Sequence, residues 1–127
     1  PAMNFADVTL AERGGKLWAE AQGLSIALPE ALARRANGHN SGKATLGVRP
    51  EDIHVATGAD PADLCIDAEI EVLEQLGSEI VLDTRVGNAA FVASVDPTTK
   101  AHVHDKLKLA LNPARIHLFD AQTEAAI

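Results

Sequence analysis

The sequence predicts an all-β domain, a small barrel or sandwich that contains one short helix. Apolar and polar residues alternate with period two along several stretches, which is the pattern of half-buried strands. These stretches are short and are separated by turns that contain Gly or Pro. Only one stretch carries the signals of a helix start and end. A chain of 127 residues is long enough to bury a core of its own.

The N-terminal third predicts a hairpin followed by the single helix. ADVTLAE and KLWAEAQ flank Gly14 and Gly15, which is a hairpin signal. Further on, Pro29 precedes EALARRAN, and Gly38 follows it. Proline at the first turn and glycine beyond the last residue are typical of a short helix.

The stretch NGHNSGKATLGVRPED, residues 37–52, resembles a phosphate-binding loop but lacks parts of one. In the motif G-x-x-x-x-G-K-[ST], backbone N–H groups hold the phosphates and the final hydroxyl binds Mg²⁺. Here Asn37 takes the place of the first glycine, and Ala44 takes the place of the hydroxyl residue. The β-forming residues that follow end at a proline, so we interpret the stretch as a polar loop that enters a strand.

The second half of the chain predicts an antiparallel meander. The loop TGADPAD, residues 57–63, is expected to separate an N-terminal sheet from this meander. The first strand places four apolar side chains on one face: Ile66, Ala68, Ile70 and Val72. Leu73 breaks this phase, which indicates a bulge or the end of the strand before a turn at Gly77. Strands over 80–86 and 89–95 follow, joined by a turn at Gly87 and Asn88.

The last two predicted strands lie at the C-terminal end. KLKLAL, residues 106–111, alternates lysines with leucines, and Asn112-Pro113 breaks the pattern before RIHLF, residues 115–119.

Composition excludes some classes of function. The formal net charge is -7, and the aromatic residues are three Phe, one Trp and no Tyr. Such a chain repels phosphate backbones and has few aromatic side chains on which nucleic-acid bases could stack, so we expect no nucleic-acid partner. Cys65 is the only cysteine, which excludes an internal disulfide. Without a membrane-length apolar run or a signal sequence, a cytoplasmic location is expected.

Candidates for chemistry each have a simpler structural explanation. The stripe Asp67, Glu69 and Glu71 is expected to be a solvated strand face. His102 and His104 lie beside Asp105, but no third metal ligand has a recognisable spacing, which favours a surface turn over a metal site. Cys65 is expected to be a packing residue. The remaining histidines are expected to be structural or exposed: His39, His54 and His117. We therefore expect no catalytic residue, cofactor or metal in this chain.

Four phrases together resemble a known family. They are PAMNF at the start, GVRPEDIHV at 47–55, EVLEQLGSEIVLDTRVG at 71–87 and LNPARIHLFDAQT at 111–123. In order and spacing they are similar to the C-terminal regulatory segment of the ATP-binding subunits of ABC importers for carbohydrates and sugar phosphates, such as the maltose and glycerol-phosphate importers. The resemblance implies an OB-type (TOBE-like) β-barrel with an additional small sheet and one short helix. It suggests N-terminal strands and the helix over 1–46, the core barrel over 47–121 and a tail over 122–127.

The resemblance also implies a function. The chain is expected to be a fragment that regulates and dimerises an ABC transport ATPase of sugar or sugar-phosphate import, without catalysis of its own. ATP and Mg²⁺ would bind an upstream nucleotide-binding domain. The implied partners are a second copy of the same domain, the membrane permease subunits through the parent protein and, in some members, a regulatory protein. The implied location is peripheral, at the cytoplasmic face of the inner membrane.

Seven residues match the motifs of the family and are structural or interface candidates: Arg49, Glu51, Leu76, Gly77, Glu79, His117 and Phe119. Arg49 and Glu51 belong to an RPE turn, in which we expect a charge-assisted pair. Leu118 and Phe119 are expected to pack in the core or in a subunit contact. A small-ligand or oxyanion-binding sensor module of the OB type is the alternative, although no matching ligand motif is present.

Overall fold

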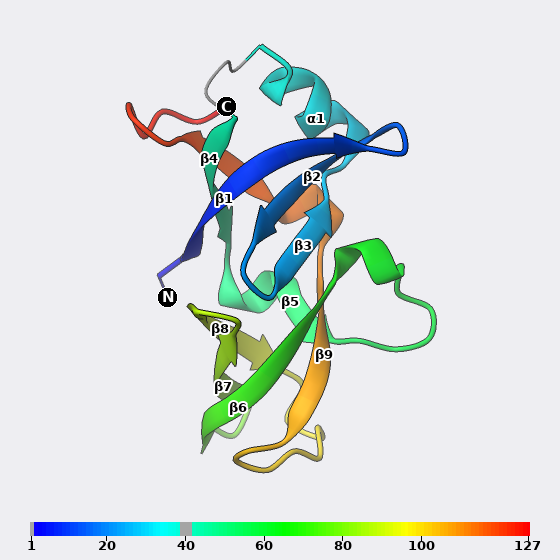
Figure 1. Cartoon of the computed structure of the whole chain (residues 1–127). Coiled ribbons are helices and arrows are strands. Elements are labelled where there is room, and N and C mark those ends of the chain that lie inside the picture. Colours follow the sequence, from blue (N-terminus) through cyan, green and yellow to red (C-terminus); the bar gives the residue numbers. More distant parts are fainter. Residues whose placement is uncertain (1, 39–41) are drawn as a thin grey trace.

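The computed structural model describes residues 2–38 and 42–127, and it contains two five-stranded antiparallel sheets (Figure 1). Sheet A has the order β10-β4-β1-β2-β3, and sheet B has the order β5-β9-β6-β7-β8. The strands of sheet A are β1 (Asn4–Arg13), β2 (Lys16–Ala21), β3 (Leu24–Ala27), β4 (Lys43–Val48) and β10 (His117–Asp120). Those of sheet B are β5 (Ile53–Val55), β6 (Cys65–Gln75), β7 (Ile80–Val86), β8 (Ala89–Val95) and β9 (Lys106–Leu111).

Helical structure is confined to short pieces in the described residues. The one α-helix is α1 (Glu30–Ala36), and the 3₁₀ turns are η1 (Pro50–Asp52), η2 (Ala62–Leu64) and η3 (Pro113–Arg115). The all-β class, the N-terminal hairpin, the helix after Pro29 and the C-terminal strands are confirmed. Strand β3 was missed, because four residues between Gly23 and Leu28 are too few to show an alternating pattern.

The predicted division of the sheets at residues 57–63 is wrong. Strand β5 comes before this loop, yet it pairs with β9 in sheet B. Strand β10 comes long after it, yet it pairs with β4 in sheet A. Each sheet therefore takes strands from both halves of the chain, because the pairing of strands is decided by long-range packing and not by their order.

A β-bulge in β6 changes which residues face the core. Ile70 pairs with Thr84 and Val72 pairs with Asp83, so Glu71 is the extra residue. Beyond a bulge the side-chain alternation shifts by one position. Val72 is consequently exposed, and Leu73 packs against the core. The predicted break in phase is confirmed, but the prediction that Val72 shares the inner face of Ile70 is wrong.

The two sheets share one core, and two of the contacts that join them involve a turn and a buried side chain. Gln22 and Gly23, between β2 and β3, lie against the turn at Gly87 between β7 and β8, and a Cβ atom on Gly87 would lie 1.8 Å from the Gln22 carbonyl oxygen. In the second contact, the buried Asn4 donates from Nδ2 to the Val92 carbonyl oxygen and accepts at Oδ1 from the Val92 N–H, both at 2.8 Å. These contacts fix sheet A against the edge of sheet B.

Candidate interaction surface

An aromatic pair lies on the outer face of sheet A. Phe5 of β1 and Phe119 of β10 flank β4, and their rings meet edge to face with the centroids 5.8 Å apart. Phe5 is 56% exposed, the largest exposed fraction among the exposed large apolar side chains of the described chain. Aromatic side chains accessible at a surface are typical of protein contacts. We call Met3, Phe5, Gly47 and Phe119 the aromatic surface.

Gly47 makes this surface possible. In the register of sheet A, Gly47 lies between Phe5 and His117. A Cβ atom at Gly47 would lie 2.6 Å from Met3 Sδ and 2.9 Å from Phe119 Cε2. The missing side chain therefore allows Met3 and Phe119 to cover the middle of β4. A hollow of about 320 Å³ beside the two rings is lined by Phe5, Thr45, Phe119 and Glu124.

His117 contributes an unusual polar atom next to this surface. Its Nε2 atom is buried and has no hydrogen-bond partner within the described part of the chain. Such atoms are rare in folded proteins, because an unpaired buried polar group costs about 1 to 3 kcal/mol. The predicted interface candidates His117 and Phe119 thus lie two residues apart on one strand, with His117 opposite Gly47.

The predicted pair of Arg49 and Glu51 does not form. Both side chains are exposed, and neither has an ion pair or hydrogen bond to any residue that the structure describes. The turn is made by the backbone instead, because the Asp52 N–H donates to the Arg49 carbonyl oxygen at 3.0 Å and Pro50 begins η1. The expected charge-assisted pair is therefore a wrong prediction.

The other three candidates lie far from the aromatic surface in the fold, in the turn between β6 and β7 of sheet B. Gly77 has a φ of 79°, and Leu76 is exposed. Glu79 accepts a hydrogen bond from Ser94 Oγ at 2.6 Å, which holds the second arm of the turn against β8. Family motifs therefore mark two separate surfaces, one on each sheet.

Residues considered for chemistry are surface or packing residues. Asp67 bonds Lys108 Nζ at 2.7 Å, and Glu71 bonds Arg85 Nε at 3.1 Å, as on a solvated strand face. His102 and His104 lie in the connection before β9, and no group of three metal-ligand side chains occurs in residues 2–38 and 42–127. His39 lies outside the described residues. Sequence analysis missed Asn4, which bonds Val92, and Gly47, which makes room for Met3 and Phe119. Both roles depend on contacts between residues that are far apart in the sequence.

Cys65 has the environment of a packing residue. Burial, together with the negative charge of Asp60, raises the pKa of its thiol above the ordinary value. The Sγ atom donates to the Pro61 carbonyl oxygen at 3.3 Å. Nucleophilic cysteines have a lowered pKa instead, so this thiol is not activated.

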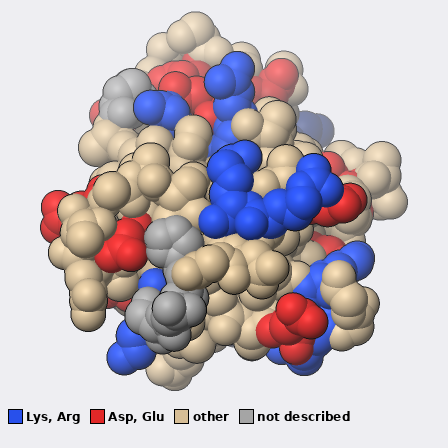
Figure 2. Space-filling view, turned by 90° about the horizontal axis from the view of Figure 1, so that it is seen from above, with Lys and Arg blue, Asp and Glu red and all other residues tan. Residues whose placement is uncertain are grey.

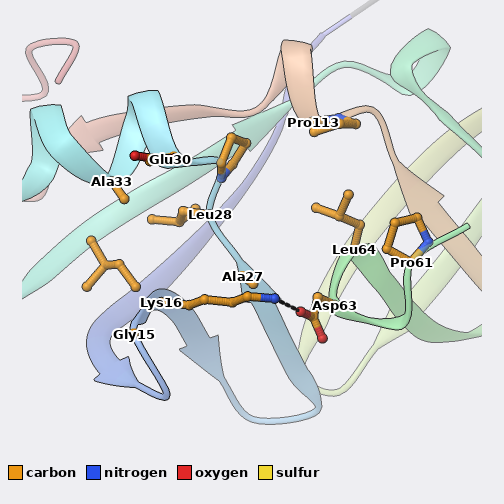
Figure 3. Close-up of a pocket in the computed structure, with 12 residues that line it drawn as sticks. Gly15, Lys16, Ala27, Leu28, Glu30, Ala33, Pro61, Asp63, Leu64 and Pro113 are labelled. Atoms are coloured by element: carbon orange, nitrogen blue, oxygen red, sulfur yellow. Dashed lines mark hydrogen bonds and ion pairs between the residues drawn. The ribbon is translucent and has the colours of Figure 1, made fainter.

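A second hollow lies between the hairpin turn of β1 and β2, the start of α1, and η2 (Figure 3). Its volume is about 490 Å³, and its walls include Leu28, Leu64 and Pro113. Lys16 Nζ lies 2.6 Å from Asp63 Oδ2 at one side of this hollow. Because the lysine is already paired and Glu30 adds another carboxylate to the wall, the hollow is poorly suited to an oxyanion.

Charge is unevenly distributed over the molecule. Viewed from the α1 end, Lys and Arg side chains gather near the centre of the face (Figure 2). Helix α1 itself carries Arg34 and Arg35 in its last turn. Asp and Glu side chains lie around this group, toward the edges of the same face (Figure 2).

The two curled sheets define a small β-domain of the OB type. The TOBE domain model matches residues 46–119 and the MalK OB fold domain model matches residues 1–53. The chain belongs to the TOBE domain family.

Curated relatives are ATP-binding proteins of importers. The multiple sugar-binding transport ATP-binding protein MsmK of Streptococcus mutans is 39% identical, over 100% of this chain and 34% of the relative. The sn-glycerol-3-phosphate import ATP-binding protein UgpC of Chromohalobacter salexigens is 36% identical, over 96% of this chain and 31% of the relative. The trehalose/maltose import ATP-binding protein MalK of Thermococcus litoralis is 29% identical, over 100% of this chain and 35% of the relative.

The chain spans about a third of the length of these relatives. Within the described residues, no helix has the length and apolar character needed to cross a membrane.

Proposed function

We propose that this chain is the regulatory and dimerisation domain of an ABC transport ATPase that energises the import of sugars or sugar phosphates. It performs no catalysis itself, and ATP and Mg²⁺ bind a nucleotide-binding domain elsewhere in the parent protein. The parent lies at the cytoplasmic face of the membrane through contacts with permease subunits. Support comes from the family and from the transport functions for which the relatives are named.

The observation that carries the dimerisation proposal is the contact of the exposed Phe5 with the half-buried Phe119. Two copies related by a twofold axis would place the same surface on both sides of the contact. Aromatic side chains bury a large area with little loss of conformational freedom, so a few of them can dominate an interface. Because Gly47 has no side chain, Met3 and Phe119 pack directly over β4 beside Phe5.

The alternative, a sensor of a small ligand or an oxyanion, would use the hollow beside Lys16 and Asp63. Two carboxylates and one paired lysine line it, and this charge set disfavours an anion. The observations therefore favour the dimerisation domain. A regulatory protein remains a further partner within this proposal.

Sedimentation velocity of the 127-residue chain tests dimerisation. We expect concentration-dependent association with a Kd of about 1 mM, which corresponds to a binding free energy of only about -4 kcal/mol. Phe119→Ser should abolish it. Leu76→Ser is the matched control, because it removes an exposed apolar side chain from sheet B and should leave the association unchanged.

Two results would contradict the proposal. One is a strictly monomeric wild-type chain at millimolar concentration, and the other is association that Phe119→Ser leaves intact. For the lack of catalysis, we expect the pure chain to hydrolyse ATP no faster than buffer, measured by phosphate release.

A further inference from the structure

A second apolar surface lies at the end of sheet B that is farthest from α1, at the bottom of Figure 1. The structure describes four exposed large apolar side chains, and three of them lie here: Val72 at 52%, Leu76 at 50% and Val103 at 44% exposure. We call these three residues, with the acidic side chains around them, the distal tip. A monomeric protein usually buries side chains of this kind or spreads them singly.

Local backbone features expose each of the three side chains. The bulge at Glu71 turns Val72 outward, although the alternation of β6 would otherwise direct it to the core. Leu76 precedes Gly77, whose φ of 79° makes the tight turn in which the Leu76 N–H donates to the Glu79 carbonyl oxygen at 2.9 Å. Val103 precedes His104, a non-glycine residue with a φ of 76°.

Backbone hydrogen bonds hold the connection that carries Val103 against β6. The His104 N–H donates to the Ile70 carbonyl oxygen at 2.7 Å, and the Ile70 N–H donates to the Asp105 carbonyl oxygen at 3.0 Å. Both bonds lie directly beside the bulge. Val103 and Val72 therefore lie on adjacent segments of backbone that are fixed by hydrogen bonds. Bulges often redirect a side chain in this way.

Acidic side chains also outnumber basic ones at the distal tip, where Arg85 and Lys106 lie opposite Glu69 on the two neighbouring strands. Residues 69–84 contain five acidic side chains and no Lys or Arg: Glu69, Glu71, Glu74, Glu79 and Asp83. Glu71 is paired with Arg85, and Glu79 is bonded by Ser94. Glu74 and Asp83 have no hydrogen bond or ion pair to another described residue, and both are exposed. Their charges are free to meet those of a partner.

We propose that the distal tip is a docking surface for a protein partner whose contacting segment is basic and amphipathic. Apolar side chains of that segment cover Val72, Leu76 and Val103, and its Lys or Arg side chains face Glu74 and Asp83. Complementary charge steers such an association and selects against acidic surfaces. Nucleic acids and anionic lipid surfaces are repelled by the same carboxylates. This surface is separate from the aromatic surface, so the proposal does not depend on dimerisation.

The test uses a synthetic helical peptide of about 18 residues, long enough to be stably helical, with Leu along one face and Lys elsewhere. A second peptide carries Glu in place of every Lys. We expect the Lys peptide to bind the wild-type chain in calorimetry, more weakly as salt rises. In NMR titrations the shifted amides should be those of residues 71–79 and 101–106.

Variants locate the contact. The triple variant Val72→Ser, Leu76→Ser, Val103→Ser should weaken peptide binding at least tenfold, roughly the effect of removing interface anchors. The double variant Glu74→Gln, Asp83→Asn retains the apolar side chains and should reduce both affinity and its salt dependence. Phe5→Ser is the matched control, because it removes an exposed apolar side chain of sheet A and should have no effect.

Three outcomes would overturn the proposal. Equal affinity for the triple variant would place the contact elsewhere, and equal binding of the Glu peptide would refute charge selection. Self-association of the wild-type chain that is lost in the triple variant but kept in Phe5→Ser would show that a second copy occupies the tip. Failure of dimerisation through Phe119 leaves all of these measurements unchanged.

Discussion

Gly87→Ala should destabilise the protein far more than Gly14→Ala, although both glycines have a φ of 58°. At Gly14 an added Cβ atom meets nothing within 4 Å. At Gly87 it would lie 1.8 Å from the Gln22 carbonyl oxygen, 2.7 Å from the Gln22 carbonyl carbon and 3.0 Å from Gly23 Cα. All three are backbone atoms, so no side-chain rotation relieves the overlap.

The magnitude can be worked from separate contributions. A left-handed conformation costs an L-residue about 1 kcal/mol or slightly more, and this cost is common to both variants. Forcing the two turns apart adds about 1 to 3 kcal/mol, as for overpacking in a core. The hydrogen bond from Asn88 Nδ2 to Gln22 Oε1, which joins the turns at 2.6 Å, is then also lost, at about 0.5 to 1.5 kcal/mol. We expect about 1 kcal/mol for Gly14→Ala and about 3 to 5 kcal/mol for Gly87→Ala.

Urea unfolding followed by circular dichroism measures both variants. The slope of the free energy of unfolding against urea should be unchanged, because the native fold buries the same surface. The two variants share the conformational cost, so their difference isolates the contact between the turns. A difference below about 0.5 kcal/mol, which is the usual scatter of independent mutations, would refute the view that this contact joins the sheets.

Two further predictions concern stability. Asn4→Ala should lower the free energy of unfolding by about 2 to 4 kcal/mol, because the Val92 N–H and carbonyl oxygen lose their partners. A loss of less than about 1 kcal/mol in urea unfolding would contradict this role of Asn4. Asp60 has a lowered pKa, chiefly because the Thr57 N–H donates to its carboxylate at 2.8 Å, with help from His54. Since the unfolded chain takes up this proton first as pH falls, the stability from Asp60 is present above the ordinary aspartate pKa of about 3.9 and is lost below it. Asp60→Asn should reduce the acid dependence of the thermal midpoint between about pH 5 and pH 2, and identical pH profiles for variant and wild type would count against the carboxylate.

The aromatic surface shows how far sequence analysis reached. The phrases that contain His117 and Phe119 marked both residues as interface candidates, and the structure brings Phe119 into contact with Phe5. No local sequence pattern predicts this contact, because β1 and β10 become neighbours only when both pair with β4. The role of Gly47 is likewise invisible in the sequence, where it looks like any glycine near a turn.

Local patterns by themselves determined the all-β class, the position of the helix after Pro29 and most of the strands. These features depend on side-chain periodicity and on turn residues, and both are properties of a few consecutive amino acids. The acidic balance and the family resemblance also needed no structure.

Tertiary structure alone decided which sheet β5 and β10 join, that the break in phase in β6 is a bulge and not the end of the strand, and that Arg49 and Glu51 remain unpaired. Strand pairing depends on how well whole faces bury one another, so β10 joins β4 across 68 intervening residues, from 49 to 116. The bulge follows from the same packing, since it lets Leu73 reach the core at the cost of exposing Val72. Long-range burial of apolar surface sets these choices, and no short stretch of sequence contains it.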